Sequence, residues 1–369
     1  MEFYIGPKIR RFAKLADFID DINLNDRDVI VSNKAIIEPH LDLIGDATLL
    51  YQEQFGEGEP SDEVYDQLRA ITPEESERII AIGGGSVMDC AKLMCYSGDF
   101  KTKDLFDSDI VPQRTKKLYA LPSTCGTGSE VTNLISVGLK ELKVKKGIGF
   151  PSMYPDEAVI VPELLKTLPY NYFATSSMDA LIHATEAFLS PRATPLSTMF
   201  SIDAIRRIMK GYRCVAELGE RAVMENVDDF LLASTNAGIA FGNAGCAAVH
   251  ALSYPLGGAY FIPHGEANQI MFMAVLKAYK EIKPVGKINE LEDLLGECLQ
   301  VPAADSLVAL DQLTKTILPV KPLNEYGVKK EDVPAMAEGV EKGQQRLLQN
   351  NYVPLSVEKM IDIYMSLYR

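Results

Sequence analysis

The sequence predicts an α/β domain with a parallel sheet, followed by an all-α domain. In the first half, short β-branched or apolar runs alternate with helical stretches, which is the pattern of strands joined by crossover helices. From about Leu168 onward the strand signals end and the sequence is almost entirely helical in period. We therefore expect an α/β domain over residues 1–167 and a helical domain over residues 168–369, with the boundary near 166–170.

The α/β domain is expected to place its ligand loops at one edge of the sheet. Helices are expected at residues 36–44 and 61–71, the second capped by Ser61. Ligands bind at the carboxyl ends of parallel strands, so the loops that follow the strands are the places to search. The strands are expected at residues 29–31, 49–51, 78–82, 118–121 and 157–161, with the return strand of a hairpin over Lys143–Phe150.

The second domain is expected to consist of helices joined by short connections. Its amphipathic stretches repeat apolar residues at helical spacing, with no strand pattern between them. The helices are expected at residues 170–190, 197–218, 225–245, 246–255, 266–280, 288–299, 304–317, 331–348 and 356–368.

The composition excludes several classes of protein. With 369 residues, of which 47% are hydrophobic, the chain can bury a large core. A net charge of -14 argues against nucleic acid or an anionic membrane as partner, because both require a basic surface. The six cysteines follow no framework spacing, and no apolar run has the length of a signal peptide or a membrane helix. We therefore expect a cytoplasmic protein with a small-molecule substrate.

A glycine-rich loop follows the strand expected at residues 78–82. Gly83, Gly84, Gly85 and Ser86 run directly into a helical stretch. Glycines let the backbone approach a phosphate closely, and the amides at a helix start favour an anion, so this loop is a candidate pyrophosphate site. The alternative is a tight turn with a capping box formed by Ser86 and Asp89. The loop is not the GxGxxG fingerprint.

A second loop, Pro122 to Glu130, follows the strand expected at residues 118–121. It is rich in hydroxyl groups and glycine, and would lie beside the first loop at the same edge of the sheet. Two such loops suggest a dinucleotide. Cys125 within it is interpreted as a space-filling residue rather than a catalytic thiol, because no histidine is near in sequence.

Three of the four histidines form a candidate metal site with one aspartate. Asp179 and His183 are four residues apart and would share one helix face. His250 and His264 flank a Gly/Pro-rich stretch, and His264, between Pro263 and Gly265, is expected to extend from a loop. Three imidazoles and one carboxylate are a plausible set of ligands for a divalent transition metal, with room for water or a substrate oxygen. Only His40 is left over.

Four segments together resemble a known family. They are GGGSVMDCAK (83–92), STCGTGSEVT (123–132), DALIHATEAF (179–188) and VHALSYPLGGAYFIPHGEAN (249–268). In these segments the sequence is similar to the iron-containing, group III alcohol dehydrogenases, and the resemblance spans nearly the whole chain. Within that family, GEPSDE, PYNYFATSSMDALIHATEAFLSP and EKGQQRLLQNNYVP most resemble members from anaerobic bacteria that act on 4-hydroxybutyrate.

The resemblance implies a dehydroquinate synthase-like fold, a nucleotide-binding first domain and a homo-oligomer. It implies iron(II), or zinc as in some relatives, held by Asp179, His183, His250 and His264. It also implies that NAD binds in the first domain, with the pyrophosphate on the glycine loop and Lys146 near the nicotinamide ribose. The implied cofactor-binding residues are Asn33, Gly84, Gly85, Ser86, Asp89, Thr124, Thr127, Ser129 and Lys146.

Two positions depart from the family pattern. Many members have another histidine four residues after the one matching His250, and here that position is Tyr254. Tyrosine has a reference pKa of about 10, against about 6.5 for histidine, so it relays protons less readily at neutral pH. The alternative roles for Tyr254 are a hydrogen bond to the substrate and simple packing. Relatives often have an aspartate where Asn33 aligns, which would repel the extra phosphate of NADP, so NADP is not excluded here.

The expected reaction is reversible hydride transfer between NADH and succinate semialdehyde, with 4-hydroxybutyrate as the alcohol. The metal would act as a Lewis acid, and water or Tyr254 would supply the proton. Arg346 is the candidate for binding the substrate carboxylate, against its simpler interpretation as a solvated arginine. The alternatives are a general primary alcohol, 1,3-propanediol or butanol dehydrogenase, a metal- and NAD-dependent lyase, and a non-catalytic metal-bound assembly protein.

Overall fold

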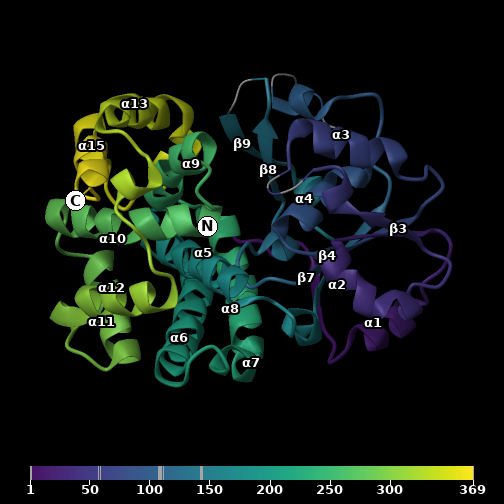
Figure 1. Cartoon of the computed structure of the whole chain (residues 1–369), viewed down its shortest axis with the longest axis horizontal. Helices are drawn as coiled ribbons and strands as arrows, with labels where there is room; N and C mark the ends of the chain where they lie inside the picture. Colours follow the sequence, from purple (N-terminus) through teal and green to yellow (C-terminus); the bar gives the residue numbers. More distant parts are fainter. Residues whose placement is uncertain are drawn as a thin grey trace. The chain divides into compact units, whose positions relative to one another are not determined.

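The computed structural model describes residues 2–56, 58, 60–106, 110, 112–141 and 144–368. They form two units, Ile5–Leu168 and Met1–Tyr4 together with Pro169–Arg369. The first is an α/β unit and the second is helical, so the expected fold class is confirmed (Figure 1). The first residues group with the helical unit because the Tyr4 amide donates to Asn243 Oδ1 at 2.7 Å and Asn243 Nδ2 donates to the Tyr4 carbonyl at 2.9 Å.

The α/β unit is built on a six-stranded parallel sheet with the order β1-β10-β7-β4-β2-β3. The strand β1 lies outside the expected set, because its sequence KIRR lacks apolar alternation and it lies at the edge, paired with β10. The other five strands match the expected ones to within two residues. The bounds are β1 Lys8–Arg11, β2 Asp28–Ser32, β3 Thr48–Tyr51, β4 Arg78–Gly83, β7 Lys117–Pro122 and β10 Glu157–Ile160.

Short helices and two small antiparallel pairs complete this unit. The helix expected over residues 36–44 is shorter, since α2 (Lys34–Ile37) passes into a 3-10 segment at Glu38–Leu43, where His40 has non-helical dihedral angles. Lys143, where the return strand of the hairpin is expected to begin, lies outside the described residues. The remaining elements are α1 Leu15–Ile22, α3 Asp62–Ile71, α4 Gly85–Met94, the pair β5 Tyr96–Ser97 and β6 Gln113–Arg114, and the hairpin β8 Leu134–Leu139 with β9 Val144–Gly149.

The helical unit is organised around α5 (Tyr170–Leu189), which contacts α6, α8 and α10. Almost every residue of α5 from Ser177 to Leu189 is buried, so polar side chains on this stretch are enclosed by protein. Charged groups are rarely enclosed in this way unless they are paired or bind a ligand. The other helices are α6 Pro195–Leu218, α7 Ala222–Glu225, α8 Val227–Ala244, α9 Ala248–Tyr260, α10 His264–Ile282, α11 Lys287–Leu299, α12 Ser306–Ile317, α13 Val333–Gly343, α14 Gln345–Leu348 and α15 Val357–Met365.

The Gly/Pro-rich stretch between the two late histidines is mostly helical. α9 continues through Pro255 to Tyr260, five residues beyond its expected end. His264 is therefore not on a loop. It is the first residue of α10, because Pro263 fixes an extended backbone at the N-cap and the helix begins directly after it.

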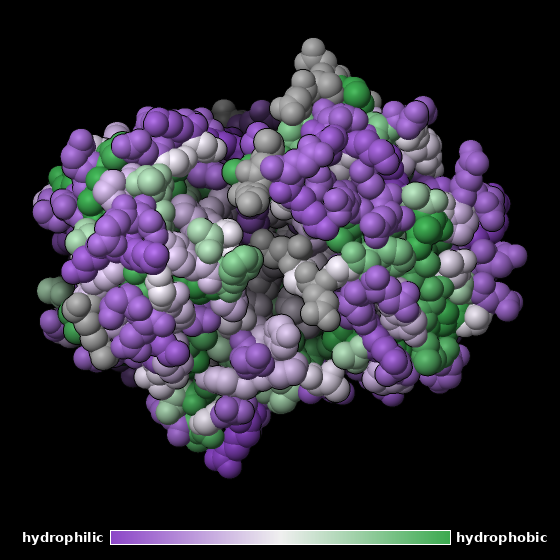
Figure 2. Space-filling model, turned by 45° about the horizontal axis from the view of Figure 1, so that its top comes forward, coloured by the Kyte–Doolittle hydropathy of each residue, from purple (hydrophilic) through white to green (hydrophobic). Residues whose placement is uncertain are grey.

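Figure 2 shows a face on which hydrophilic residues predominate and hydrophobic residues appear between them. Within the part of the chain that the structure describes, no helix is long and apolar enough to cross a membrane.

Candidate metal centre

Three helices bring the predicted metal ligands together. Asp179 and His183 lie one turn apart on α5, His250 lies on the first turn of α9, and His264 begins α10. Asp179, His183 and His250 are buried, with exposed fractions of 4%, 5% and 3%. The His264 side chain keeps 29% of its surface exposed, so it is the ligand candidate nearest to solvent.

The distances between these side chains suit one small cation. Asp179 Oδ1 lies 3.4 Å from His250 Nε2 and 3.7 Å from His264 Nε2. Ligand atoms around a tetrahedral metal with bonds of about 2.1 Å are about 3.4 Å apart. His250 Nε2 is buried and makes no hydrogen bond among the described residues. Buried polar atoms nearly always have a partner, and a metal bound in front of His250 Nε2 would be that partner.

The electrostatics of the cluster favour an ionised aspartate beside imidazoles. Burial alone would raise the pKa of Asp179, but His183, His264 and His250 hold that pKa far below its usual range. Burial alone would lower the pKa of His250, but the carboxylates of Glu186 and Asp179 outweigh it and raise the pKa to about 9. The cluster thus combines an ionised carboxylate with nitrogen donors, and in the metal-free protein His250 carries a positive charge at neutral pH.

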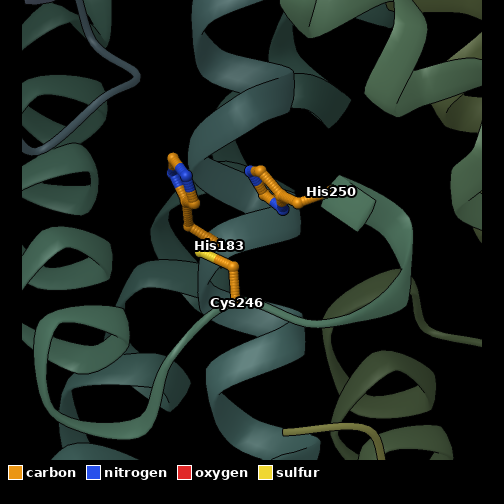
Figure 3. A group of neighbouring side chains, drawn as sticks. All are labelled: His183, Cys246 and His250. Atoms are coloured by element: carbon orange, nitrogen blue, oxygen red, sulfur yellow. The ribbon is translucent and has the colours of Figure 1, made fainter. Parts of the chain in front are cut away.

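His183 occupies a different position from the other three. Its Nδ1 lies 3.8 Å from Asp179 Oδ2, and its ring stacks on His250 with centroids 4.6 Å apart. Figure 3 shows the two rings side by side, with Cys246 extending toward them from the segment that precedes α9. Ligand atoms of His183, Cys246 and His250 lie within 4.8 Å of one another, as do those of Asp179, His250 and His264. The cluster therefore contains two overlapping sets of possible ligands.

Two buried polar residues that the sequence reasoning missed surround the ligands. Glu186 Oε2 lies 2.6 Å from His250 Nδ1, and Asn268 Nδ2 donates to Asp179 Oδ1 at 2.8 Å. Glu186 is three residues after His183, and Asn268 is four residues after His264. This spacing places each on the same helix face as a predicted ligand, which is the signal that could have found them.

Tyr254 lies close to the cluster. It is one turn after His250 on α9, half-buried, and its ring centroid is 6.2 Å from that of His264. An aromatic hydroxyl in this position is near enough to the exposed side of the cluster to meet a small substrate. Its role, as a proton donor, as a hydrogen-bond partner of the substrate or as a packing residue, stays a prediction.

The two predicted loops of the α/β unit do meet. β4 and β7 are neighbours, so the glycine loop and the Pro122–Glu130 loop leave the sheet at the same edge. A β-carbon on Gly85 would lie 2.7 Å from Thr127 Cγ2, and one on Gly84 would lie 3.4 Å from Thr124 Cγ2. Gly85 cannot be replaced without displacing Thr127, so the contact between the loops requires a residue without a side chain.

Asp89 and Ser129 are engaged with a buried lysine. Lys92 Nζ donates to Ser129 Oγ and to the Leu134 carbonyl, each at 2.7 Å, and lies 3.4 Å from Asp89 Oδ1. Asp89 also accepts from Ser129 Oγ and from the Ser136 amide. The capping-box alternative is wrong, because the N-cap of α4 is Gly84, which has no side chain to cap the helix, and Ser86 Oγ donates to the Gly58 carbonyl instead.

The other predicted residues are distributed around this edge and beyond it. Asn33 follows β2 and donates to Glu53 Oε2 at 2.9 Å, so a carboxylate lies beside the position where relatives have an aspartate. Lys146 is exposed on β9. Cys125 is 1% exposed, in keeping with the space-filling interpretation. Arg346 is exposed on α14 in the helical unit.

One hollow of the helical unit contains none of the predicted site residues. It has a volume of about 420 Å³ and lies along α6 and α11, with Arg206, Lys210, Arg213, Cys214, Glu217, Glu297 and Cys298 at its wall. Two of its cations are paired with acids, Arg206 with Glu297 and Lys210 with Asp229. The candidate metal ligands and the two predicted loops do not line this hollow.

Comparison with known proteins gives consistent matches over both units. The model described as iron-containing alcohol dehydrogenase matches residues 6–162, and the one described as the C-terminal part of the Fe-containing alcohol dehydrogenase family matches residues 173–368. The chain is 44% identical to 4-hydroxybutyrate dehydrogenase of Clostridium kluyveri, over 99% of each sequence. It is 32% identical to 1,3-propanediol dehydrogenase of Klebsiella pneumoniae, over 79% of each. The structure of an iron-containing alcohol dehydrogenase from Thermococcus thioreducens is similar, with a TM-score of 0.86, 25% identity and 100% of both chains covered.

Proposed function

The chain belongs to the iron-containing alcohol dehydrogenase family, and from this premise we propose that it is an NAD-dependent 4-hydroxybutyrate dehydrogenase. It is an alcohol oxidoreductase, and the proposed reaction is reversible hydride transfer between NADH and succinate semialdehyde. The observation that carries this assignment is the 44% identity to the Clostridium kluyveri enzyme over 99% of each sequence. The 1,3-propanediol dehydrogenase match covers less of the chain at lower identity, so a general alcohol dehydrogenase is the second candidate.

The donor set of the helical unit fits a divalent metal. Asp179, His183, His250 and His264 would hold it, and the buried His250 Nε2 supports this because it lacks a hydrogen bond among the described residues. Nitrogen and carboxylate donors suit iron(II) and zinc, of which iron is our proposal. When bound, the metal would polarise the aldehyde oxygen as a Lewis acid. Asp179 would offset its charge, and the three imidazoles would fix its geometry.

The cofactor would bind on the α/β unit, where the contact between the two loops supports the proposal. Gly84, Gly85 and Ser86 would bind the pyrophosphate with backbone amides at the start of α4. Thr124 and Thr127 are half-buried and lie against these glycines, so they would follow the cofactor toward the nicotinamide. Ser129, Asp89, Asn33 and Lys146 complete the proposed set. NADH, when bound, would supply the hydride.

Tyr254 is the proposed partner of the substrate oxygen. Its ring is near His264 and half-buried, so its hydroxyl could donate to that oxygen or pass a proton from water. The remaining expectations, a cytoplasmic location and a homo-oligomer, are proposals as well. Light scattering after size-exclusion chromatography would measure the oligomer.

The assignment is tested by substrate charge. Anaerobically purified, iron(II)-loaded protein is given NADH or NADPH, with succinate semialdehyde and, in parallel, uncharged butyraldehyde. We expect strong preference for the semialdehyde with NADH. Equal or faster turnover of butyraldehyde would leave a general alcohol dehydrogenase, and turnover of neither aldehyde would overturn the redox assignment.

A further inference from the structure

Glu186 is a buried carboxylate that connects α5 with the start of α9. It is 3% exposed and lies one turn after His183. Its Oε1 accepts the Val249 amide at 2.6 Å, and its Oε2 accepts the Ala247 amide at 2.9 Å. Oε2 is also 2.6 Å from His250 Nδ1. One side chain therefore fixes both the backbone that leads into His250 and the ring of that residue.

The hydrogen-bond pattern determines which ring nitrogen of His250 carries the hydrogen. A carboxylate is an acceptor only, and each oxygen of Glu186 already accepts a backbone N–H. The hydrogen between Glu186 and His250 must then come from Nδ1, which leaves the lone pair of the neutral ring on Nε2. That atom faces Asp179 Oδ1 at 3.4 Å and is the buried nitrogen without a hydrogen bond among the described residues.

We propose that Glu186 is a positioning residue that holds His250 with its hydrogen on Nδ1 and its Nε2 lone pair directed at the metal position. The proposal rests on the proposed metal-dependent function. Carboxylates that accept the second N–H of a ligating imidazole orient the ring and raise its basicity, and their loss typically lowers metal affinity about 10–100-fold. Glu186 would thereby fix the ring orientation so that Nε2, once it has lost its hydrogen, presents its lone pair to the metal.

A purely structural role for Glu186 makes a different prediction. Ala247 is the N-cap of α9, and Ala247 and Val249 supply two of the amides that have no partner within the helix. If capping were the whole role, Glu186→Gln would keep one oxygen for an amide, lose the other and cost some stability, but would leave the zinc affinity unchanged. In the positioning role, the new amide group donates toward Nδ1, moves the ring hydrogen to Nε2 and blocks the ligand atom.

The first experiment measures zinc affinity without reference to turnover. Zinc is titrated into metal-free wild type, Glu186→Gln and Glu292→Gln at pH 7.5 in competition with a chromophoric chelator. Glu292 is a matched control, since it is buried in the same unit and accepts from Lys280 and Asn289, far in sequence from the ligands. We expect the affinity to fall about 10–100-fold in Glu186→Gln and to stay at the wild-type value in Glu292→Gln. Equal affinity in all three proteins would overturn the proposal.

The second measurement reads the ring hydrogen directly in metal-free protein. Long-range ¹H–¹⁵N spectra at pH 10, above the pKa of His250, distinguish hydrogen on Nδ1 from hydrogen on Nε2. We expect Nδ1–H in the wild type and Nε2–H in Glu186→Gln. Nε2–H in the wild type would overturn the proposal even if the variant failed to fold. Because this measurement needs neither metal nor substrate, it separates failure of this inference from failure of the dehydrogenase assignment.

Discussion

Each unit contains a buried cluster of charged residues, and the two clusters are completed differently. In the α/β unit, Lys92 Nζ has two acceptors at 2.7 Å and Asp89 at 3.4 Å, and both oxygens of Asp89 accept hydrogen bonds. In the helical unit, Asp179 Oδ1 accepts from Asn268, yet His250 Nε2 makes no hydrogen bond among the described residues. The first cluster joins loops to one another, whereas the second leaves a buried nitrogen without a hydrogen bond among the described residues, as a site for a cation would.

The difference shows how burial alone misleads a search for function. Burial lowers the pKa of Lys92, and the charge of Asp89 opposes this shift. Burial would raise the pKa of Asp179, but the histidines lower it. Lys92 and Asp179 are therefore both in perturbed surroundings. Only the second cluster combines an unsatisfied nitrogen with ligand atoms at the spacing of a metal site. The informative feature is the missing partner, and four measurements test the distinction.

The largest effect is expected from Asp179→Asn. The substitution keeps the size of the side chain but removes the charge that would balance a divalent cation, so turnover should fall more than about 1,000-fold, which corresponds to several kcal/mol of lost stabilisation. NADH oxidation with succinate semialdehyde measures it, together with the metal content. Asp203→Asn is the control, because Asp203 pairs with Arg207 on the partly exposed side of α6. Full metal content in Asp179→Asn would contradict the interpretation of the helical cluster as a metal site.

Lys92→Met should destabilise the α/β unit and spare the metal site. It leaves the half-buried Asp89 without its cation, and loss of one partner of a largely enclosed pair costs up to about 3 kcal/mol. Urea unfolding measures the loss, and NADH fluorescence should show weaker cofactor binding because Ser129 and Leu134 lose their donor. Zinc affinity should not change. The double variant Asp89→Asn/Lys92→Met should regain part of the stability, and a further loss instead would show that the pair is not coupled.

Metal-free protein should lose stability as the pH rises from about 6.5 to about 9. The fold raises the pKa of His250 to about 9, so the charged ring stabilises the fold fully below the unfolded value of about 6.5, and this contribution is lost as the pH passes 9. Its size is on the order of 3 kcal/mol. Thermal unfolding across this range measures it. His250→Gln should flatten the profile, and an unchanged profile in that variant would assign the loss to another group.

The smallest effect is expected at the edge of the α/β unit. Glu53 accepts from Asn33 Nδ2 at 2.9 Å and from the Lys34 amide at 2.6 Å. If the cofactor binds beside Asn33 as proposed, this carboxylate would repel the extra phosphate of NADP. Glu53→Gln should raise kcat/KM with NADPH about 10-fold, or about 1.4 kcal/mol. Glu38→Gln, which removes an exposed partner of Lys34, serves as the control. Equal use of NADPH by the wild type would remove Glu53 from this role.

Much of the fold and the ligand residues could be predicted because their signals are local. Buried strands such as β4 are continuous apolar runs, and Asp179 and His183 share a helix face through their spacing alone. The edge strand β1 has no such signal, since most of its residues are charged. The residues Pro263 and Gly265 on either side of His264 are typical of a loop, which is why the sequence predicts one there. A proline is also common at the start of a helix, and here Pro263 is the N-cap of α10.

The supporting residues could not be paired from sequence because their partners are distant along the chain. Asp89 and Ser129 are 40 residues apart, and Glu186 and His250 are 64 residues apart. The composition of each segment gives no reason to prefer one partner among many. The position of Glu186, one turn after a predicted ligand, is the part of this arrangement that is visible in the sequence.

The contact between Tyr4 and Asn243 affects the order in which the two units can fold during synthesis. The chain contributes Met1–Tyr4 to the helical unit, continues through the whole α/β unit and then returns. During synthesis, Ile5–Leu168 can fold while the partner of Tyr4 has not yet been translated, since domains generally fold as units from the N-terminal side. Tyr4 must wait until Asn243, 239 positions further along the chain, has emerged from the ribosome. Phe3, which stacks on Phe200, must likewise wait for that residue.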